Sequence, residues 1–220
     1  MGSIRYIHDV RGWPLRAFLG GTAVAVVAAV IASSGDVAGW ERAVFHALND
    51  LPDWLRNPLW VFQLAGILFV PLVVAVVAAA MRRFRLAGAL VALIPLKLIA
   101  ERWIVKQLVE RQRPGTSICH LDERCGHFRD VPLVGLSFVS GHAIITWGVV
   151  TLLWPYLPGR WRWLPVTVAL ANAIARVYLG AHNPLDLVAG AGVGVALGGL
   201  LTMGFGSPAR SKATTMITRA

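Results

Sequence analysis

Hydrophobic residues fall in six runs along the chain, separated by more polar stretches. A helix crosses the hydrocarbon core of a bilayer in about 20 residues, and most of the runs approach that length. Because lipid offers the backbone no hydrogen-bonding partner, each run is predicted to form a transmembrane helix. The six predicted spans are residues 15–33, 58–81, 86–105, 141–157, 164–179 and 184–203.

The stretch between the first two runs has a pattern of its own. A helical spacing links four apolar residues there: Trp40, Val44, Leu48 and Leu51. This spacing predicts a short amphipathic helix that lies on the outer membrane surface.

The first run admits two interpretations. Its basic start and its small-residue end, Val30-Ile31-Ala32, are also typical of a cleavable signal peptide. The run is long for a signal core, which favours a retained helix.

Composition supports a membrane protein. Of 220 residues, 56% are hydrophobic and only 15% are charged, whereas about a quarter of the residues of a soluble domain are charged. We therefore predict an all-α integral membrane bundle of about six helices. The length fits one domain, predicted at residues 1–206, with a cytoplasmic tail at 207–220.

The distribution of charge orients the bundle. The net charge of +10 would suit a nucleic-acid-binding domain, but the basic residues flank apolar runs, as positive-inside topology requires. The segment 34–57 has four acids and two arginines. The opposite side has one acid, Asp9, and eleven basic residues: Arg5, Arg11, Arg16, Arg82, Arg83, Arg85, Arg160, Arg162, Arg210, Lys212 and Arg219. We predict a multi-pass plasma-membrane protein with both termini in the cytoplasm and no nucleic-acid partner.

Two cysteines lie in one polar stretch on the predicted non-cytoplasmic side. An oxidising compartment there would favour a disulfide between Cys119 and Cys125. Free thiols remain an alternative. So does a zinc site completed by His120 and His127, although the spacing matches no standard zinc pattern.

The connection between the third and fourth spans lies on the same predicted side, yet it is basic. Five cations fall in it: Lys106, Arg111, Arg113, Arg124 and Arg129. Because positive charge is not favoured there by topology, we expect it to serve an anionic ligand.

Polar clusters mark three helix ends at this face. Arginine and lysine bind phosphoryl oxygens, and a helix start with glycine offers backbone amides to an anion. A pair of histidines can supply a nucleophile and a proton donor. The clustered residues are Lys106, Arg113, Ser140, Gly141, His142, Arg176, His182 and Asp186.

These residues resemble a known signature. Lys106 is followed after six residues by Arg113-Pro114, then comes Ser140-Gly141-His142, and Arg176 is followed by His182 and Asp186. Their order and spacing are similar to the three-part signature of the type 2 phosphatidic acid phosphatase superfamily, the membrane lipid phosphate phosphatases, which vanadium haloperoxidases share. Val139 and Ala175 depart from it, since the family usually has proline and serine at these positions.

The resemblance implies a haloperoxidase-like helical core and a role for each matching residue. His182 would attack phosphorus, Asp186 would orient its imidazole, and His142 would protonate the leaving oxygen. The phosphoryl oxygens would be bound by Lys106, Arg113, Ser140, the Gly141 amide and Arg176. Neither a metal nor another cofactor is implied.

Structural roles are the alternatives at several of these positions. Asp186 follows Asn183 and Pro184, a good helix start, so its carboxylate is also suited to capping. Ser140 is likewise suited to an N-cap. Lys106 and Arg113 are suited to interfacial anchoring, and the neighbouring pair Lys97 and Glu101 shares one helix face and is interpreted as structural.

The sequence therefore predicts hydrolysis of a lipid phosphate or diphosphate at the outer membrane face. Polyprenyl diphosphate is the first choice of substrate, ahead of phosphatidylglycerol phosphate and phosphatidic acid, and no protein partner beyond the membrane lipids is inferred. The rival hypotheses are a vanadate-dependent peroxidase and a non-enzymatic lipid-binding protein.

Overall fold

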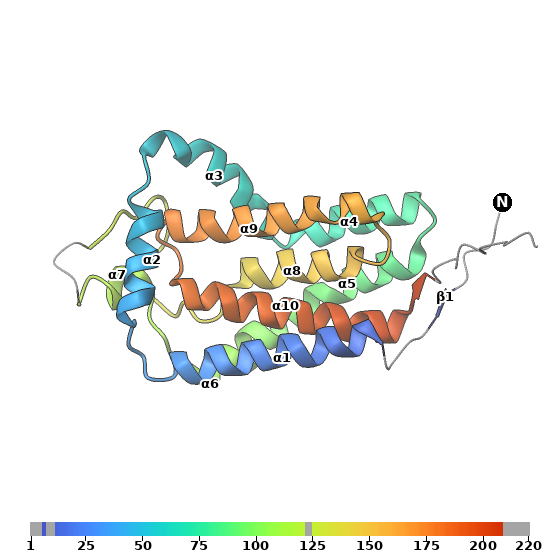
Figure 1. Cartoon of the computed structure of the whole chain (residues 1–220), viewed down its shortest axis with the longest axis horizontal. Coiled ribbons are helices and arrows are strands. Elements are labelled where there is room, and N and C mark those ends of the chain that lie inside the picture. Colours follow the sequence, from blue (N-terminus) through green and yellow to red (C-terminus); the bar gives the residue numbers. More distant parts are fainter. Residues whose placement is uncertain (1–5, 8–11, 122–124, 209–220) are drawn as a thin grey trace, which may run out of the picture.

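The computed structural model describes residues 6–7, 12–121 and 125–208, which form a helical bundle (Figure 1). The all-α prediction is confirmed, because the only strands in this part of the chain are β1 (Tyr6–Ile7) and β2 (Ser207–Pro208), which pair antiparallel. The α-helices are α1 (Trp13–Ala32), α2 (Gly39–Asn49), α3 (Arg56–Gln63), α4 (Phe69–Ala80), α5 (Phe84–Leu98), α6 (Lys106–Leu108), α7 (Pro114–Ser117), α8 (Gly141–Leu153), α9 (Trp163–Tyr178) and α10 (Pro184–Phe205). Shorter turns are the 3-10 helices η1 (Asp53–Leu55), η2 (Leu64–Gly66) and η4 (Gly159–Trp161) and the π-helix η3 (Ile99–Val105).

Membrane-spanning character is clearest at the two ends of the chain. Within the described residues, α1 and α10 are each long and apolar enough to cross a bilayer. A third candidate arises if Asp53–Gly66 and Phe69–Ala80 are counted as one bent span. The predicted runs at 86–105, 141–157 and 164–179 form α5 with η3, α8 and α9.

The second predicted span, 58–81, is wrong as a continuous helix. It is divided into two parts bent by 65°, and Ile67 takes an extended conformation at the break. Gly66 packs directly on α8, since a Cβ built there would lie 2.6 Å from the Cβ of His142. The break therefore lies beside the predicted site, and Pro71 favours it because a proline cannot donate to the Ile67 carbonyl.

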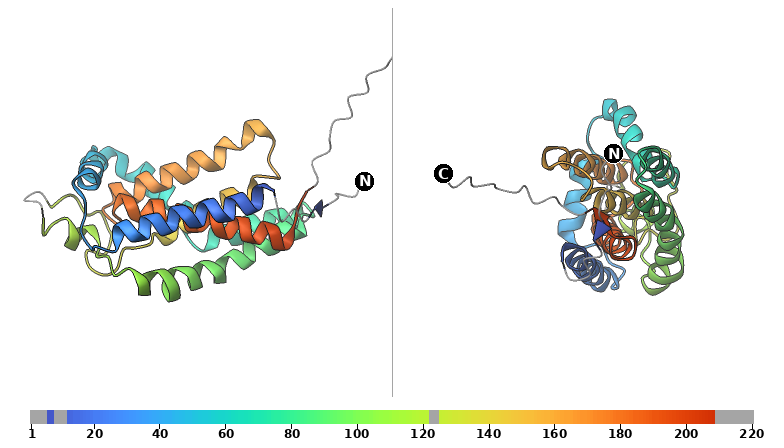
Figure 2. Two further views of the ribbon diagram at one scale, coloured as in Figure 1. Left: turned by 60° about the horizontal axis from the view of Figure 1, so that its bottom comes forward. Right: turned by 90° about the vertical axis from the view of Figure 1, so that its right-hand side faces the viewer.

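Helix α10 lies at the centre of the bundle, between α1 and α8 (Figure 2). Small residues allow the close approach. A Cβ built on Gly21 of α1 would lie 2.5 Å from the carbonyl oxygen of Gly192, and one built on Gly194 would lie 2.5 Å from that of Ile144. Association of helices in lipid depends on such close packing.

Helix α2 is amphipathic, but the apolar stripe that predicted it is not the face that packs. Trp40 and Val44 are 53% and 40% exposed. The buried face is formed by Glu41, Phe45 and Asn49. This helix lies across the ends of α9 and α10 (Figure 1), so it covers the end of the bundle where those two helices are joined.

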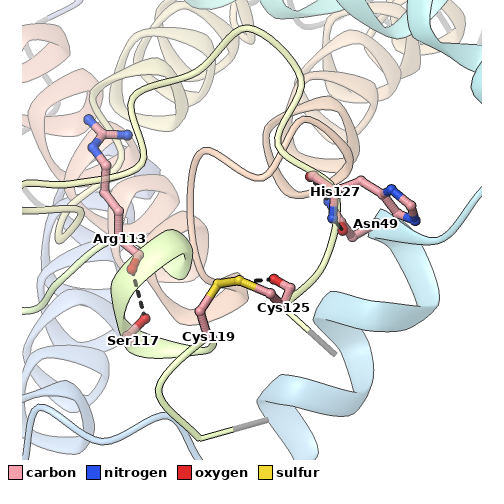
Figure 3. The surroundings of a disulfide bond; sticks show 6 residues. All are labelled: Asn49, Arg113, Ser117, Cys119, Cys125 and His127. Carbon is pink, nitrogen blue, oxygen red and sulfur yellow. Dashed lines mark hydrogen bonds between the residues drawn. A yellow bond between two sulfur atoms is a disulfide. The ribbon is translucent and has the colours of Figure 1, made fainter. Parts of the chain in front are cut away.

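The connection after α6 is closed by a disulfide between Cys119 and Cys125, with Cα atoms 4.2 Å apart. The bond replaces the free-thiol and zinc alternatives. Figure 3 shows His127 beside Asn49 of α2 and Arg113 extending away from the bond. Asn49 donates to the His127 carbonyl at 2.7 Å and accepts from its N–H at 2.5 Å. The loop is thereby attached to α2.

The predicted cytoplasmic tail at 207–220 lies outside the described residues except for Ser207 and Pro208. These two residues pair with Tyr6 and Ile7. The two terminal segments therefore meet at the end of the bundle opposite α2 (Figure 1).

We expect Gly21→Leu to destabilise the bundle, because the new side chain would meet the backbone of α10. Overpacking of this kind costs about 1–3 kcal/mol. The matched control is Gly20→Leu, since a Cβ at Gly20 meets no atom within 4 Å. Thermal unfolding in detergent should show a lower midpoint for the Gly21 variant only. Equal midpoints would contradict the close α1–α10 contact.

Candidate active site

The residues predicted from the sequence all lie at the end of the bundle that α2 covers. Lys106 begins α6 and Arg113 precedes α7, while Ser140 to His142 stand at the start of α8. Arg176 is in the last turn of α9. His182 lies between α9 and α10, and Asp186 is in the first turn of α10. Five separate stretches of chain thus supply one site.

His182 and Asp186 form its buried centre, with 4% and 0% of their surfaces exposed. The Nδ1 atom of His182 lies 3.5 Å from Oδ2 of Asp186. The same carboxylate oxygen accepts a hydrogen bond from the N–H of Asn183 at 2.9 Å. Asp186 therefore caps α10 and faces the imidazole at once, and the two roles considered for it coexist.

Burial lowers the pKa of His182 well below its ordinary value, and the neighbouring cations Arg176, Arg113 and Lys106 lower it further. At neutral pH its imidazole is therefore uncharged. With Nδ1 turned toward a carboxylate, the lone pair is placed on Nε2. An uncharged imidazole with a free Nε2 lone pair is the state that a nucleophile needs.

Three cations surround this centre, and each is held by a single partner. Arg113 donates from Nη1 to the carbonyl of Ala181 at 2.8 Å. Arg176 donates from Nη1 to Oε1 of Gln63 at 2.6 Å. Lys106 donates to Glu101 Oε1 at 2.7 Å. These contacts leave most of the donors of the two guanidinium groups available to an anion.

Glu101 connects Lys106 to the interior of the bundle. The predicted Lys97–Glu101 pair is present as a buried ion pair. Both side chains press on Gly141, because a Cβ built there would lie 2.5 Å from Glu101 Oε2 and 2.6 Å from Lys97 Nζ. Only glycine fits at this helix start, which explains the residue type in the motif.

Ser140 Oγ and Arg176 Nε are among the buried polar atoms of the site that have no hydrogen-bond partner in the part of the chain that the structure describes. The Ser140 hydroxyl does not cap α8. The backbone N–H of Ser140 donates to the Asp186 carbonyl at 3.1 Å. Unsatisfied buried donors are costly. A hydroxyl and a guanidinium N–H of this kind suit an anionic ligand.

His142 stands in the first turn of α8, where Gly66 packs against it. Arg176 and Lys97 are the cations that act most on its imidazole, and His182 is a further neighbour. The second histidine of the signature therefore belongs to the same cluster as the first.

Two of the cations that the sequence assigned to an anionic ligand are instead paired with acids of the protein. Arg111, interpreted from the sequence as a ligand for an anion, is instead 1% exposed and paired with Glu41 and Asp186. Burial acts against its charge, but the two carboxylates raise the pKa of Arg111 above its ordinary value. Arg129 is likewise paired, with Asp53 at 3.0 Å. Arg124 lies outside the described residues.

A weak signal in the sequence could have pointed to the partners of Arg111 and Arg176. Glu41 shares one helix face with Phe45 and Asn49, at four-residue intervals. Gln63 is a polar residue inside a run that is otherwise apolar. Both side chains are hydrogen-bond acceptors. A buried acceptor needs a partner, and a nearby cation can supply it.

Comparison with known proteins gives a family match and two groups of relatives. Residues 61–206 match the family model of the PAP2 superfamily. The chain is 33% identical over 100 residues to decaprenylphosphoryl-5-phosphoribose phosphatase of Mycobacterium tuberculosis, a match covering 44% of this chain and 50% of that protein. It is 45% identical over 56 residues to undecaprenyl-diphosphatase of Sulfolobus acidocaldarius, covering 24% and 26%. The chain thus spans half or less of the length of these relatives.

Two solved structures share the fold. The crystal structure of Aquifex aeolicus LpxE gives a TM-score of 0.65 at 20% identity and covers 76% of this chain and 96% of that one. A transmembrane PAP2-type phosphatidylglycerolphosphate phosphatase from Bacillus subtilis gives 0.59 at 17% identity, covering 86% and 94%. At these identities the likeness concerns the fold, which is that of a membrane protein. Because the family match takes in about two thirds of the chain and every predicted site residue, this protein belongs to the PAP2 superfamily.

Proposed function

We propose that this protein hydrolyses a lipid phosphate or diphosphate through a phosphohistidine formed on His182. The observation that carries the proposal is a buried, uncharged imidazole beside Asp186, surrounded by cations and next to the unpaired Ser140 hydroxyl. The names of the relatives, which are phosphatases acting on polyprenyl compounds, support the same chemistry.

In the first step, Nε2 of His182 attacks phosphorus as the bond from phosphorus to the leaving oxygen breaks. His142 gives its proton to that oxygen, and the lipid product departs. In the second step, His142 removes a proton from water, the resulting hydroxide attacks phosphorus, and the phosphorus–nitrogen bond breaks. Inorganic phosphate leaves and His182 is restored.

Charge on the phosphoryl group is stabilised by fixed groups. Arg113 and Arg176 supply forked donors, Lys106 supplies a point charge, and the start of α8 supplies the Gly141 amide and the Ser140 hydroxyl. Because these groups already balance the anion, we propose that the reaction needs no metal.

The lipid chain has a place beside this site. An apolar cavity of about 370 Å³ is lined by Ala65, Val70, Thr146, Val150 and residues of α9. Its lining comes nearest to the site at Thr146, one turn after His142 on α8, and at Ala65, which precedes Gly66. An apolar chain held there would leave its phosphate at the cluster of cations. We propose polyprenyl diphosphate as substrate ahead of phosphatidylglycerol phosphate and phosphatidic acid.

The site is proposed to open on the non-cytoplasmic side of the plasma membrane, with both termini in the cytoplasm. The basic residues that flank the opposite helix ends support this orientation. A membrane-impermeant thiol reagent should label Leu133→Cys on intact cells, because Leu133 is exposed at the site end. Arg82→Cys, between α4 and α5, should stay unlabelled. The reverse pattern would invert the proposed topology.

His182→Ala should lower kcat by more than 1,000-fold, since the covalent step is lost, and His142→Ala by about 100- to 10,000-fold, as for loss of a general acid. The control is His120→Ala, an exposed loop histidine outside the cluster, which should keep kcat. Phosphate release from a lipid phosphate in detergent measures all three.

Equal release by His182→Ala and the unchanged protein would contradict the nucleophile, whereas no release by the unchanged protein would favour a protein that only binds lipid. The metal-free part of the mechanism has a separate test. Activity should survive EDTA, and strong inhibition that added divalent cations reverse would overturn it.

The identity of the lipid substrate can be tested with a panel of lipid phosphates. We expect kcat/KM for polyprenyl diphosphate to exceed that for phosphatidylglycerol phosphate and phosphatidic acid by at least about tenfold, roughly 1.4 kcal/mol of transition-state stabilisation. Initial rates at matched detergent-to-lipid ratios provide the comparison. A higher value for either glycerophospholipid would reassign the substrate while leaving the phosphatase proposal intact.

A further inference from the structure

A buried ion pair connects α2 to the site. Arg111 and Glu41 are each 1% exposed, and they bind in a bidentate manner: Nη1 donates to Oε1 at 2.9 Å and Nη2 to Oε2 at 2.6 Å. Arg111 comes from the loop after α6, and Glu41 from the first turn of α2. The pair therefore fastens two segments that are 70 residues apart.

The Arg111–Glu41 pair also contacts the first turn of α10. Nη1 of Arg111 also lies 3.4 Å from Oδ1 of Asp186, while Oδ2 of the same carboxylate faces His182 Nδ1 at 3.5 Å. Glu41 Oε1 in addition accepts from the N–H of Leu185 at 2.8 Å. Both ends of the pair thus hold the first turn of α10, the turn that presents Asp186 to the imidazole.

Asp186 needs such a partner. It is fully buried, and an ionised carboxylate without a cation is very costly in that environment. Among the described residues, Arg111 is the cation in salt-bridge contact with it, since its other neighbour, His182, is uncharged. The other cations of the site, Arg113, Arg176 and Lys106, bond to different acceptors.

We propose that Glu41 and Arg111 are positioning residues for the phosphatase reaction: they keep the Asp186 carboxylate charged and aimed at Nδ1 of His182. This inference rests on the proposed function. It makes α2 part of the catalytic assembly, since Glu41 fixes the orientation of the Arg111 guanidinium. A bidentate carboxylate fixes an arginine fork in one plane, which a lysine could not reproduce.

A purely structural pair is the competing explanation, because buried ion pairs often contribute little to stability and can be exchanged for apolar residues. The two explanations differ in what happens when Asp186 is already changed. A positioning residue has nothing left to position in an Asp186→Asn protein, whereas a structural residue keeps its effect.

The test is a double-mutant cycle in detergent with a lipid phosphate substrate. Arg111→Met should lower kcat by roughly 10- to 100-fold, the range found for groups that orient a functional histidine, with KM changed by less than about threefold. In the Asp186→Asn background the same substitution should lower kcat by less than about threefold. Arg111→Lys should recover only part of the loss.

The matched control is Arg129→Met. Arg129 is also a buried arginine at this end of the bundle, but it is paired with Asp53 and contacts Tyr178. Whatever its effect on kcat, that effect should be the same with Asp186 or Asn at position 186. An equal loss from Arg111→Met in the two backgrounds would overturn the positioning role.

Loss of folding is separated from loss of positioning by a double replacement, Glu41→Met with Arg111→Met. It removes both charges together and is expected to keep the bundle folded. The thermal midpoint and competitive inhibition by inorganic phosphate should stay near those of the unchanged protein, while kcat falls as in Arg111→Met. A double variant with unchanged kcat would contradict the inference, whereas activity in His182→Ala would instead contradict the proposed function.

Discussion

A charged group that is buried at the end of an apolar bundle must be paired, either with another protein group or with a bound ligand. This constraint determines which residues meet at the site. Asp186 and Glu41 share Arg111, and Glu101 holds Lys97 and Lys106. Ser140 Oγ and Arg176 Nε have no partner among the described residues. Acids are thus neutralised within the protein, while cationic donors are left for an anion. A phosphoryl group, with its negatively charged oxygens, is the ligand that these unpaired donors suit.

Close helix packing is what brings these groups together. Gly141 allows Lys97 and Glu101 to reach the start of α8, and Gly66 allows the bent α3–α4 segment to pack on His142. The same bend borders the apolar cavity, whose lining includes Ala65, Val70 and Thr146. A phosphate site and a place for a lipid chain are therefore consequences of one arrangement, in which glycine lets backbone and side chain approach.

Much of the helical plan could be predicted from hydrophobic runs, and the residues around His182 from a motif whose parts lie at successive helix ends. The break at Ile67 was not predicted, although Pro71 is a signal for it, because a proline cannot donate to the carbonyl four residues earlier. The contact of Gly66 with another helix could not be predicted from hydrophobic runs. The role of α2 was hidden for a similar reason. Its apolar stripe predicted a helix on the membrane surface and gave no sign of the buried ion pair that Glu41 forms with Arg111 from a distant loop.

Covalent phosphorylation of His182 during turnover can be measured directly. Protein mixed with a lipid phosphate, quenched within milliseconds under alkaline denaturing conditions that preserve phosphohistidine, can be digested and analysed by mass spectrometry. We expect a phosphoryl group on the peptide that contains His182, and none in the His182→Ala variant. Turnover with no phosphorylated His182, or with the label on His142, would contradict it.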